Sequence, residues 1–122
     1  MELKICHMYP DVLNLYGDRG NVICMRSRLE RRGIDCAVTR LPIGSAASLA
    51  GFDLVFIGGG QDFEQQVLLD DLHRGKAQEI RAAIADGVTF LTICGGYQML
   101  GSYYETYDGQ RCDFIGALDL YT

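Results

Sequence analysis

One cysteine lies where the chain could build a nucleophile. Cys94 follows the apolar segment 88–93 and is followed at once by Gly95 and Gly96. A strand that turns sharply into a glycine-flanked helix is the geometry of a nucleophile elbow, which lifts the reactive atom above the edge of a sheet. The glycines leave room for a substrate, and the start of a helix favours the anionic form of a thiol. We predict that Cys94 is a nucleophile, the alternative being a buried structural cysteine.

A second glycine-rich turn could complete the site. A thiol that attacks an amide carbonyl needs hydrogen-bond donors for the developing oxyanion, and the amide of Gly95, directly after the nucleophile, is one such donor. Three glycines at 58–60 follow the apolar run 54–57 and could supply the other, because glycine lets backbone amides point inward. We predict that Gly59 or Gly60 is the second donor; otherwise the three glycines form a simple loop.

Composition excludes several other classes of function. The chain has 122 residues, five cysteines and a formal net charge of −5, which suits one acidic domain and argues against nucleic acid as a partner. No signal peptide is evident and no apolar run approaches the ~20 residues that cross a bilayer, so we expect a cytoplasmic protein. The cysteines are odd in number, which speaks against disulfide or metal frameworks. Structural roles are expected for Cys6, Cys24, Cys36 and Cys112.

The elements that must position the two turns follow from the apolar pattern. Short apolar runs predict strands, and helical spacing closed by glycine predicts helices. We expect a loop over residues 9–20, followed by a helix that begins at Asn21 and is stopped by Gly33. A later helix should end at Asp86, and Gly75 should separate it from a shorter helix before it. That shorter helix would hold Phe63, Val67 and Leu68. The expected strands are 3–8, 34–41, 54–57 and 88–93.

Strands that alternate with helices predict an α/β fold with a doubly wound, mainly parallel, flavodoxin-like sheet. In such a sheet any site lies at the carboxyl ends of the strands, so both glycine-rich turns should meet at one edge. A short helix should follow Cys94 through Leu100. Beyond it, segment 103–106, a turn at 108–109 and segment 114–121 are expected to pair as a hairpin.

Three separated segments resemble one family. Residues 93–101 (ICGGYQMLG) are similar to the nucleophile motif of class I glutamine amidotransferases of the cobyric acid synthase-like branch. Other segments look like GatD, the family of glutaminase subunits of lipid II isoglutaminyl synthases. These segments are residues 9–11 (YPD), 13–21 (LNLYGDRGN) and 58–62 (GGGQD), together with the pair Glu64–Gln65. The resemblance covers essentially the whole chain.

The resemblance implies a fold and an activity. Residues 1–122 would be the N-terminal part of a single class I glutamine amidotransferase domain, incomplete at the C-terminus. Cys94 would form a glutamyl thioester, and the released ammonia would pass to a Mur-ligase-like partner, MurT, that amidates the D-glutamate of lipid II in peptidoglycan synthesis. No cofactor is expected in this chain, whereas ATP and Mg²⁺ are expected on the ligase.

Several positions depart from the family or carry only a weak expectation. Thr92 stands where the wider class commonly has glycine, and Phe63 stands where relatives are expected to have a charged residue. Gln98 and Glu64 are expected to contact substrate, the alternative being an ordinary surface role, which polar residues there more often have.

Residues 1–122 contain no counterpart of the histidine that the resemblance implies as the proton donor for the leaving ammonia. The family histidine lies beyond residue 122, and only His7 and His73 are present. His73 is expected at the surface. His7, near the end of the first strand, is a minor alternative as the base. The chain alone is therefore expected to be inactive.

Other functions remain open on the residues alone. A cobyric acid synthase-type amidotransferase domain would have the same elbow but a different acceptor. A non-catalytic pseudo-glutaminase that docks on a ligase would explain the missing histidine but not the intact elbow. A cysteine peptidase or redox sensor would have a reactive thiol without glutamine specificity.

Overall fold

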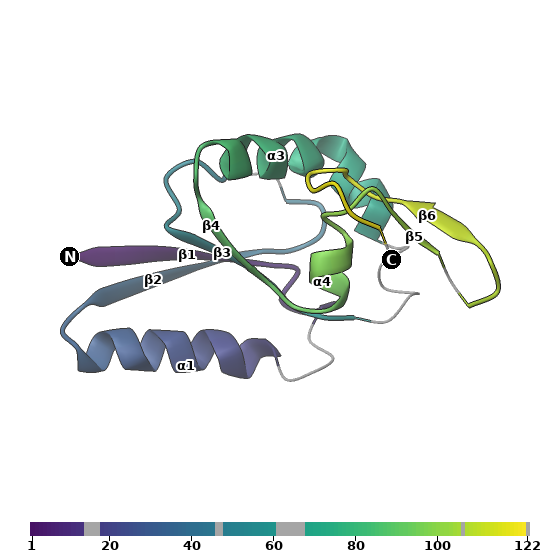
Figure 1. The fold of residues 1–122 in the computed structure, drawn as a ribbon. Coiled ribbons are helices and arrows are strands. Elements are labelled where there is room, and N and C mark those ends of the chain that lie inside the picture. The colour runs from purple at the N-terminus through teal and green to yellow at the C-terminus, as the bar shows by residue number, and fades with distance from the viewer. Residues whose placement is uncertain (14–17, 46–47, 61–67, 106, 122) are drawn as a thin grey trace.

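A parallel sheet forms the centre of the chain (Figure 1). The computed structural model describes residues 1–13, 18–45, 48–60, 68–105 and 107–121. The sheet has four strands in the order β2-β1-β3-β4, all parallel, so each connection crosses over a face of the sheet. The strands are β1 (Glu2–Met8), β2 (Asp35–Leu41), β3 (Leu54–Ile57) and β4 (Thr89–Thr92).

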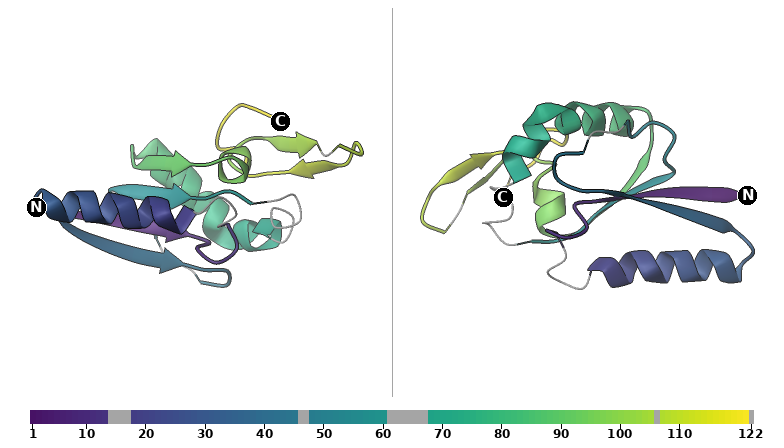
Figure 2. Two further views of the ribbon diagram at one scale, coloured as in Figure 1. Left: turned by 90° about the horizontal axis from the view of Figure 1, so that it is seen from below. Right: turned by 180° about the vertical axis from the view of Figure 1, so that it is seen from behind.

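Helices cover the two faces of this sheet. Helix α1 (Asp18–Arg31) lies on one face, while the π-helical turn η1 (Leu72–Lys76) and helix α3 (Ala77–Ala85) lie on the other (Figures 1 and 2). The predicted doubly wound α/β fold is therefore confirmed. The glycine break is confirmed as well, because Gly75, inside η1, has a φ of 124° and marks a kink between two helical segments, a conformation that L side chains rarely adopt.

The core lies mainly between the sheet and α3. Cys6 and Met8 of β1 and Val55 of β3 belong to one buried cluster with Ile80 of α3. Alternate residues of a strand point to opposite faces, so His7 faces α1 instead. Strand β4 closes the described sheet at one edge, and its side chains alternate between exposed and half-buried.

The predicted boundary between the first loop and the first helix is wrong. Helix α1 begins at Asp18, three residues before the predicted cap Asn21, and the loop after β1 is correspondingly shorter. Gly20 suggested a loop, but a helix tolerates glycine near its end at a modest energetic cost. Its position also has open space around it.

The predicted hairpin exists, but with a different second strand. Strand β5 (Tyr103–Glu105) pairs antiparallel with β6 (Arg111–Asp113), whereas segment 114–121 meets β5 in an isolated parallel bridge between Tyr103 and Tyr121. Phe114 and Ile115 are buried in the core, so burial of these side chains decides the local structure there. Within the described residues no helix combines the length and the apolar character that a membrane crossing requires.

Candidate active site

The register of the sheet brings the predicted site residues to one edge. Met8 of β1, Ile57 of β3 and Thr92 of β4 are register partners, and the Ile93 amide donates a hydrogen bond to the Ile57 carbonyl at 2.9 Å. The loop after β1, the 58–60 turn and the turn at Cys94 therefore all leave the sheet at its carboxyl edge. The predicted common edge is thus observed for the described residues.

Cys94 has the backbone of an elbow. Its φ is 50° and its ψ is −109°, and the short helix α4 (Gly95–Gln98) starts at the next residue. A non-glycine residue in this region costs about 1–3 kcal/mol and persists only where its surroundings enforce it, often at functional sites. The Gln98 amide donates to the Cys94 carbonyl at 3.0 Å, which ties the turn to α4. The side chain of Cys94 is exposed, so the alternative of a buried structural cysteine is wrong.

The two glycine-rich turns pack directly against each other. A Cβ placed on Gly96 would lie 2.6 Å from the Gly58 carbonyl oxygen and 2.7 Å from that of Ile57. Real Cβ atoms essentially never approach so closely, so only glycine allows the start of α4 to rest on the end of β3. This contact holds the nucleophile turn and the 58–60 turn together, as one site requires.

The predicted oxyanion donors lie at this contact. Gly59, Gly60 and Gly95 are all buried. Among the described residues, the Gly95 amide makes no backbone hydrogen bond, whereas that of Gly96 donates to the Ile93 carbonyl at 2.9 Å. Gly95 can therefore direct its N–H group toward a substrate oxygen beside the sulfur. The catalytic roles of Cys94 and of these three glycines stay predictions.

The two histidines lie in different surroundings. His7 is 3% exposed, lies on β1, and packs edge-to-face on Phe56 of β3 with ring centroids 5.3 Å apart. Strand β3 separates β1 from β4, the strand that leads to Cys94. His73 is exposed on η1, as expected. Neither placement favours a proton relay to Cys94.

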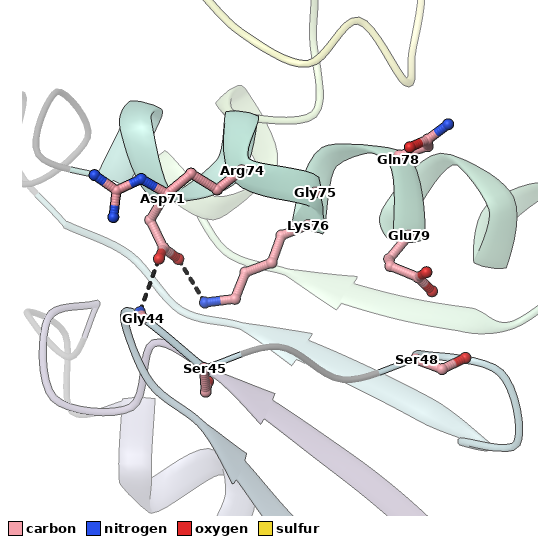
Figure 3. A pocket seen from close by; sticks show the side chains of 9 residues that line it. All are labelled: Gly44, Ser45, Ser48, Asp71, Arg74, Gly75, Lys76, Gln78 and Glu79. Atoms are coloured by element: carbon pink, nitrogen blue, oxygen red, sulfur yellow. Dashed lines mark hydrogen bonds and ion pairs between the residues drawn. The ribbon is translucent and has the colours of Figure 1, made fainter.

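The remaining weak expectations are placed only in part. Gln98 is half-buried on the last turn of α4, whereas Glu64 and Phe63 lie outside the described residues. Within the described chain no group of three His, Cys, Asp or Glu side chains is placed to hold a metal ion. A cavity of about 500 Å³ is lined by residues from the loop after β2 and from η1 and α3, and not by Cys94 (Figure 3).

Sequence reasoning missed a buried polar cluster at the same edge of the sheet. The Asp71 carboxylate pairs with the Lys76 ammonium at 2.5 Å and accepts a hydrogen bond from the Tyr9 hydroxyl at 2.7 Å. Burial alone would raise the pKa of Asp71, but hydrogen bonds from Lys76, Gly44 and Tyr9 outweigh it and hold the pKa below its usual value. Burial and the Asp71 carboxylate raise the pKa of Tyr9. No local sequence signal joins residues so far apart.

The structure sharpens a prediction about thiol reactivity. Cys94 and Cys24 are both exposed, whereas Cys6 is buried beside Lys76 and its burial raises the pKa to about 12. We expect a haloacetamide at neutral pH to modify Cys94 faster than every other cysteine, including Cys24, which is also exposed, because Cys94 lies at a turn flanked by two glycines. Mass mapping after brief labelling measures this. Modification of Cys24 with Cys94 untouched would contradict the elbow.

The chain matches a known protein family. The family model for CobB/CobQ-like glutamine amidotransferase domains matches residues 4–122. The chain belongs to this family. Glutamine amidotransferase chemistry is thus the family context of the Cys94 turn. The solved structure of a protein from Listeria monocytogenes EGD-e, described as a peptidase E, matches with a TM-score of 0.59 over 96% of this chain and 63% of that one. At 17% identity this likeness shows the fold alone.

Two curated relatives of this amidotransferase domain are GatD subunits of lipid II isoglutaminyl synthase (glutamine-hydrolyzing). The one from Staphylococcus aureus (strain N315) is 43% identical over 121 residues, which is 99% of this chain and 49% of that protein. The one from Streptococcus pneumoniae (strain ATCC BAA-255 / R6) is 37% identical over 121 residues, 99% of this chain and 46% of that protein. The chain spans about half the length of these relatives.

Proposed function

We propose that the chain is the nucleophile-bearing part of a cytoplasmic glutaminase subunit of the GatD type. The observation that carries this proposal is the strained backbone of Cys94 at a turn that Gly96 locks onto the 58–60 turn. A nucleophile and two sources of oxyanion donors then share one edge of the sheet. The identity with two GatD subunits supports glutamine as the substrate.

The proposed chemistry proceeds in two steps. The Cys94 sulfur attacks the side-chain amide carbon of glutamine, and the amides of Gly95 and of Gly59 or Gly60 hold the oxyanion. When the tetrahedral intermediate collapses, the carbon–nitrogen bond breaks, ammonia leaves with the proton it needs, and a glutamyl thioester remains on Cys94. Water then attacks the thioester, which releases glutamate and restores the thiol. We assign the proton transfers to a general acid–base group outside residues 1–122, in the half that the GatD relatives have in addition.

The ammonia is proposed to serve a partner enzyme. The resemblance to GatD implies a Mur-ligase-like subunit, MurT, that uses ATP and Mg²⁺ to activate the D-glutamate carboxyl of lipid II for amidation. Activation of a carboxylate by ATP makes it an electrophile that ammonia can attack. A cobyric acid synthase-type domain would deliver ammonia to another carboxylate, so the acceptor that is amidated in the presence of the partner distinguishes the two.

Ammonia release from glutamine tests the proposal. We expect the complete gene product with its ligase partner to release ammonia, and residues 1–122 alone to do so at least about a hundredfold more slowly, because loss of an acid–base group costs 10²- to 10⁴-fold. No release by the complete pair would favour a pseudo-glutaminase docking module. Robust turnover by residues 1–122 alone would require His7 or His73 as the base.

A further inference from the structure

Two residues at the carboxyl edge share an unusual backbone. In the part of the chain that the structure describes, Tyr9 and Cys94 are the only non-glycine residues with a positive φ, 52° and 50°. Tyr9 directly follows Met8, whose register partner is Ile57, and Ile57 in turn pairs with Thr92, two residues before Cys94. Because neighbouring strands lie about 4.8 Å apart, Met8 and Thr92, which are two strands apart in this row, are separated by about 10 Å. The strained backbone of Tyr9 is therefore part of the same edge.

Contacts at both ends of Tyr9 enforce this conformation. Its amide donates to the Leu41 carbonyl at 2.9 Å, and its hydroxyl donates to the Asp71 carboxylate at 2.7 Å. The Lys76 ammonium lies 4.6 Å from the centre of the Tyr9 ring, a cation–π distance, and the tyrosine is 1% exposed. We call Tyr9, Asp71 and Lys76 the Tyr9 clamp.

The clamp joins the loops that leave three strands. Asp71, on the helical segment after β3, also accepts a hydrogen bond from the Gly44 amide at 2.8 Å (Figure 3). Lys76 donates to the Pro42 carbonyl at 2.8 Å. Pro42 and Gly44 lie in the loop after β2, and Tyr9 begins the loop after β1. Each of these loops leaves the sheet at the edge where Cys94 lies.

The buried ion pair between Asp71 and Lys76 is not explained by a contribution to the stability of the fold. Asp71 and Lys76 are 5% and 6% exposed, and the desolvation of two buried charges offsets most or all of their attraction. Apolar side chains of similar volume often stabilise a core as well or better, whereas buried polar groups can select one conformation among several. The conformation selected here is the strained turn at Tyr9.

We propose that the Tyr9 clamp positions residues 9–13, the described part of the loop after β1, as a wall of the glutamine site. This inference rests on the proposed glutaminase function. Tyr9, Asp71 and Lys76 act as positioning residues: they hold backbone beside the 58–60 turn and do not touch the substrate. The clamp therefore sets how well glutamine binds, while Cys94 and the oxyanion amides set how fast it reacts.

Removal of the Tyr9 hydroxyl group tests this inference in the complete gene product with its ligase partner. Tyr9→Phe keeps the ring and removes the hydrogen bond to Asp71. We expect KM for glutamine to rise about tenfold, the loss typical of one hydrogen bond to a charged group, while kcat changes much less. Tyr107→Phe is the matched control, because Tyr107 is 99% exposed on the hairpin between β5 and β6, and both constants should stay unchanged.

Labelling of Cys6 separates positioning from general loosening. Cys6 is 1% exposed in the core beside the clamp, so its reaction with iodoacetamide reports opening of the fold. A second variant, Asp71→Asn, keeps the shape of the side chain. In both Tyr9→Phe and Asp71→Asn we expect KM for glutamine to rise, while Cys6 stays as protected from labelling as in the unmodified enzyme. An unchanged KM in both variants would overturn the inference. Cys6 labelling that rises together with KM, or unfolding of both variants, would overturn it as well. Failure of the proposed function would appear instead as no glutamine turnover in the unmodified enzyme.

Discussion

Cys94→Ser in the complete gene product with its partner should abolish ammonia release from glutamine. A serine hydroxyl at this turn is a far weaker nucleophile than a thiol, and loss of the nucleophile from a comparable active site costs on the order of 10³-fold or more. The fold should be retained, because the Cys94 side chain is exposed and the exchange of sulfur for oxygen adds no volume. Steady-state ammonia release measures the effect.

Cys24→Ser is the matched control for this substitution. Cys24 is exposed like Cys94 but lies on α1, away from both glycine-rich turns. Its replacement should leave ammonia release within the error of the assay. Activity that survives in Cys94→Ser, or that disappears in Cys24→Ser, would show that the nucleophile has been assigned to the wrong cysteine.

Gly96→Ala should disable the site without touching a reacting atom. The added methyl group would meet the carbonyl oxygens of Gly58 and Ile57 at 2.6 and 2.7 Å, so backbone must move. We expect a loss of about 1–3 kcal/mol in the free energy of unfolding, as for other overpacked sites. Displacement of the nucleophile from the oxyanion amides should lower glutaminase activity by roughly 10²- to 10³-fold.

Gly20→Ala is the control for Gly96→Ala. A Cβ on Gly20 meets nothing within 4 Å, and the residue lies inside α1. Alanine there should stabilise the chain by roughly 0.5–1 kcal/mol, because glycine loses more conformational freedom in a helix. Denaturant unfolding of both variants measures the difference. Equal stability changes at the two glycines would contradict the packing of α4 on the end of β3.

The parts of the fold that could be predicted are those with strong local signals. The apolar run Leu54–Ile57 and the stop at Gly87 each depend on adjacent residues, and the structure has β3 and the end of α3 where these signals place them. The start of α1 could not be placed as well, because Asp18 and Asn21 are both good capping residues and Gly20 lies between them. The partner of β5 was also mistaken, since an apolar segment can enter the core without forming a strand.

Only the part of the candidate site that has a strong local sequence signal could be predicted. Cys94 and the 58–60 turn stand out because glycine after an apolar strand is a local pattern, and the common edge follows from parallel topology. The Tyr9 clamp leaves no such pattern. Asp71 lies 62 residues from Tyr9, and charged side chains in a sequence normally indicate surface. Only the packed structure shows that two of them are buried together.

Trapping of the covalent intermediate would show whether Cys94 is the residue that reacts with glutamine. The complete enzyme with its partner would be mixed with glutamine, quenched in acid during turnover, and digested for mass mapping of its cysteine peptides. The account predicts that the peptide with Cys94 gains the mass of a glutamyl group, and that the modification is absent when glutamine is replaced by glutamate. Ammonia release without a glutamyl group on Cys94, or with one on another cysteine, would contradict it.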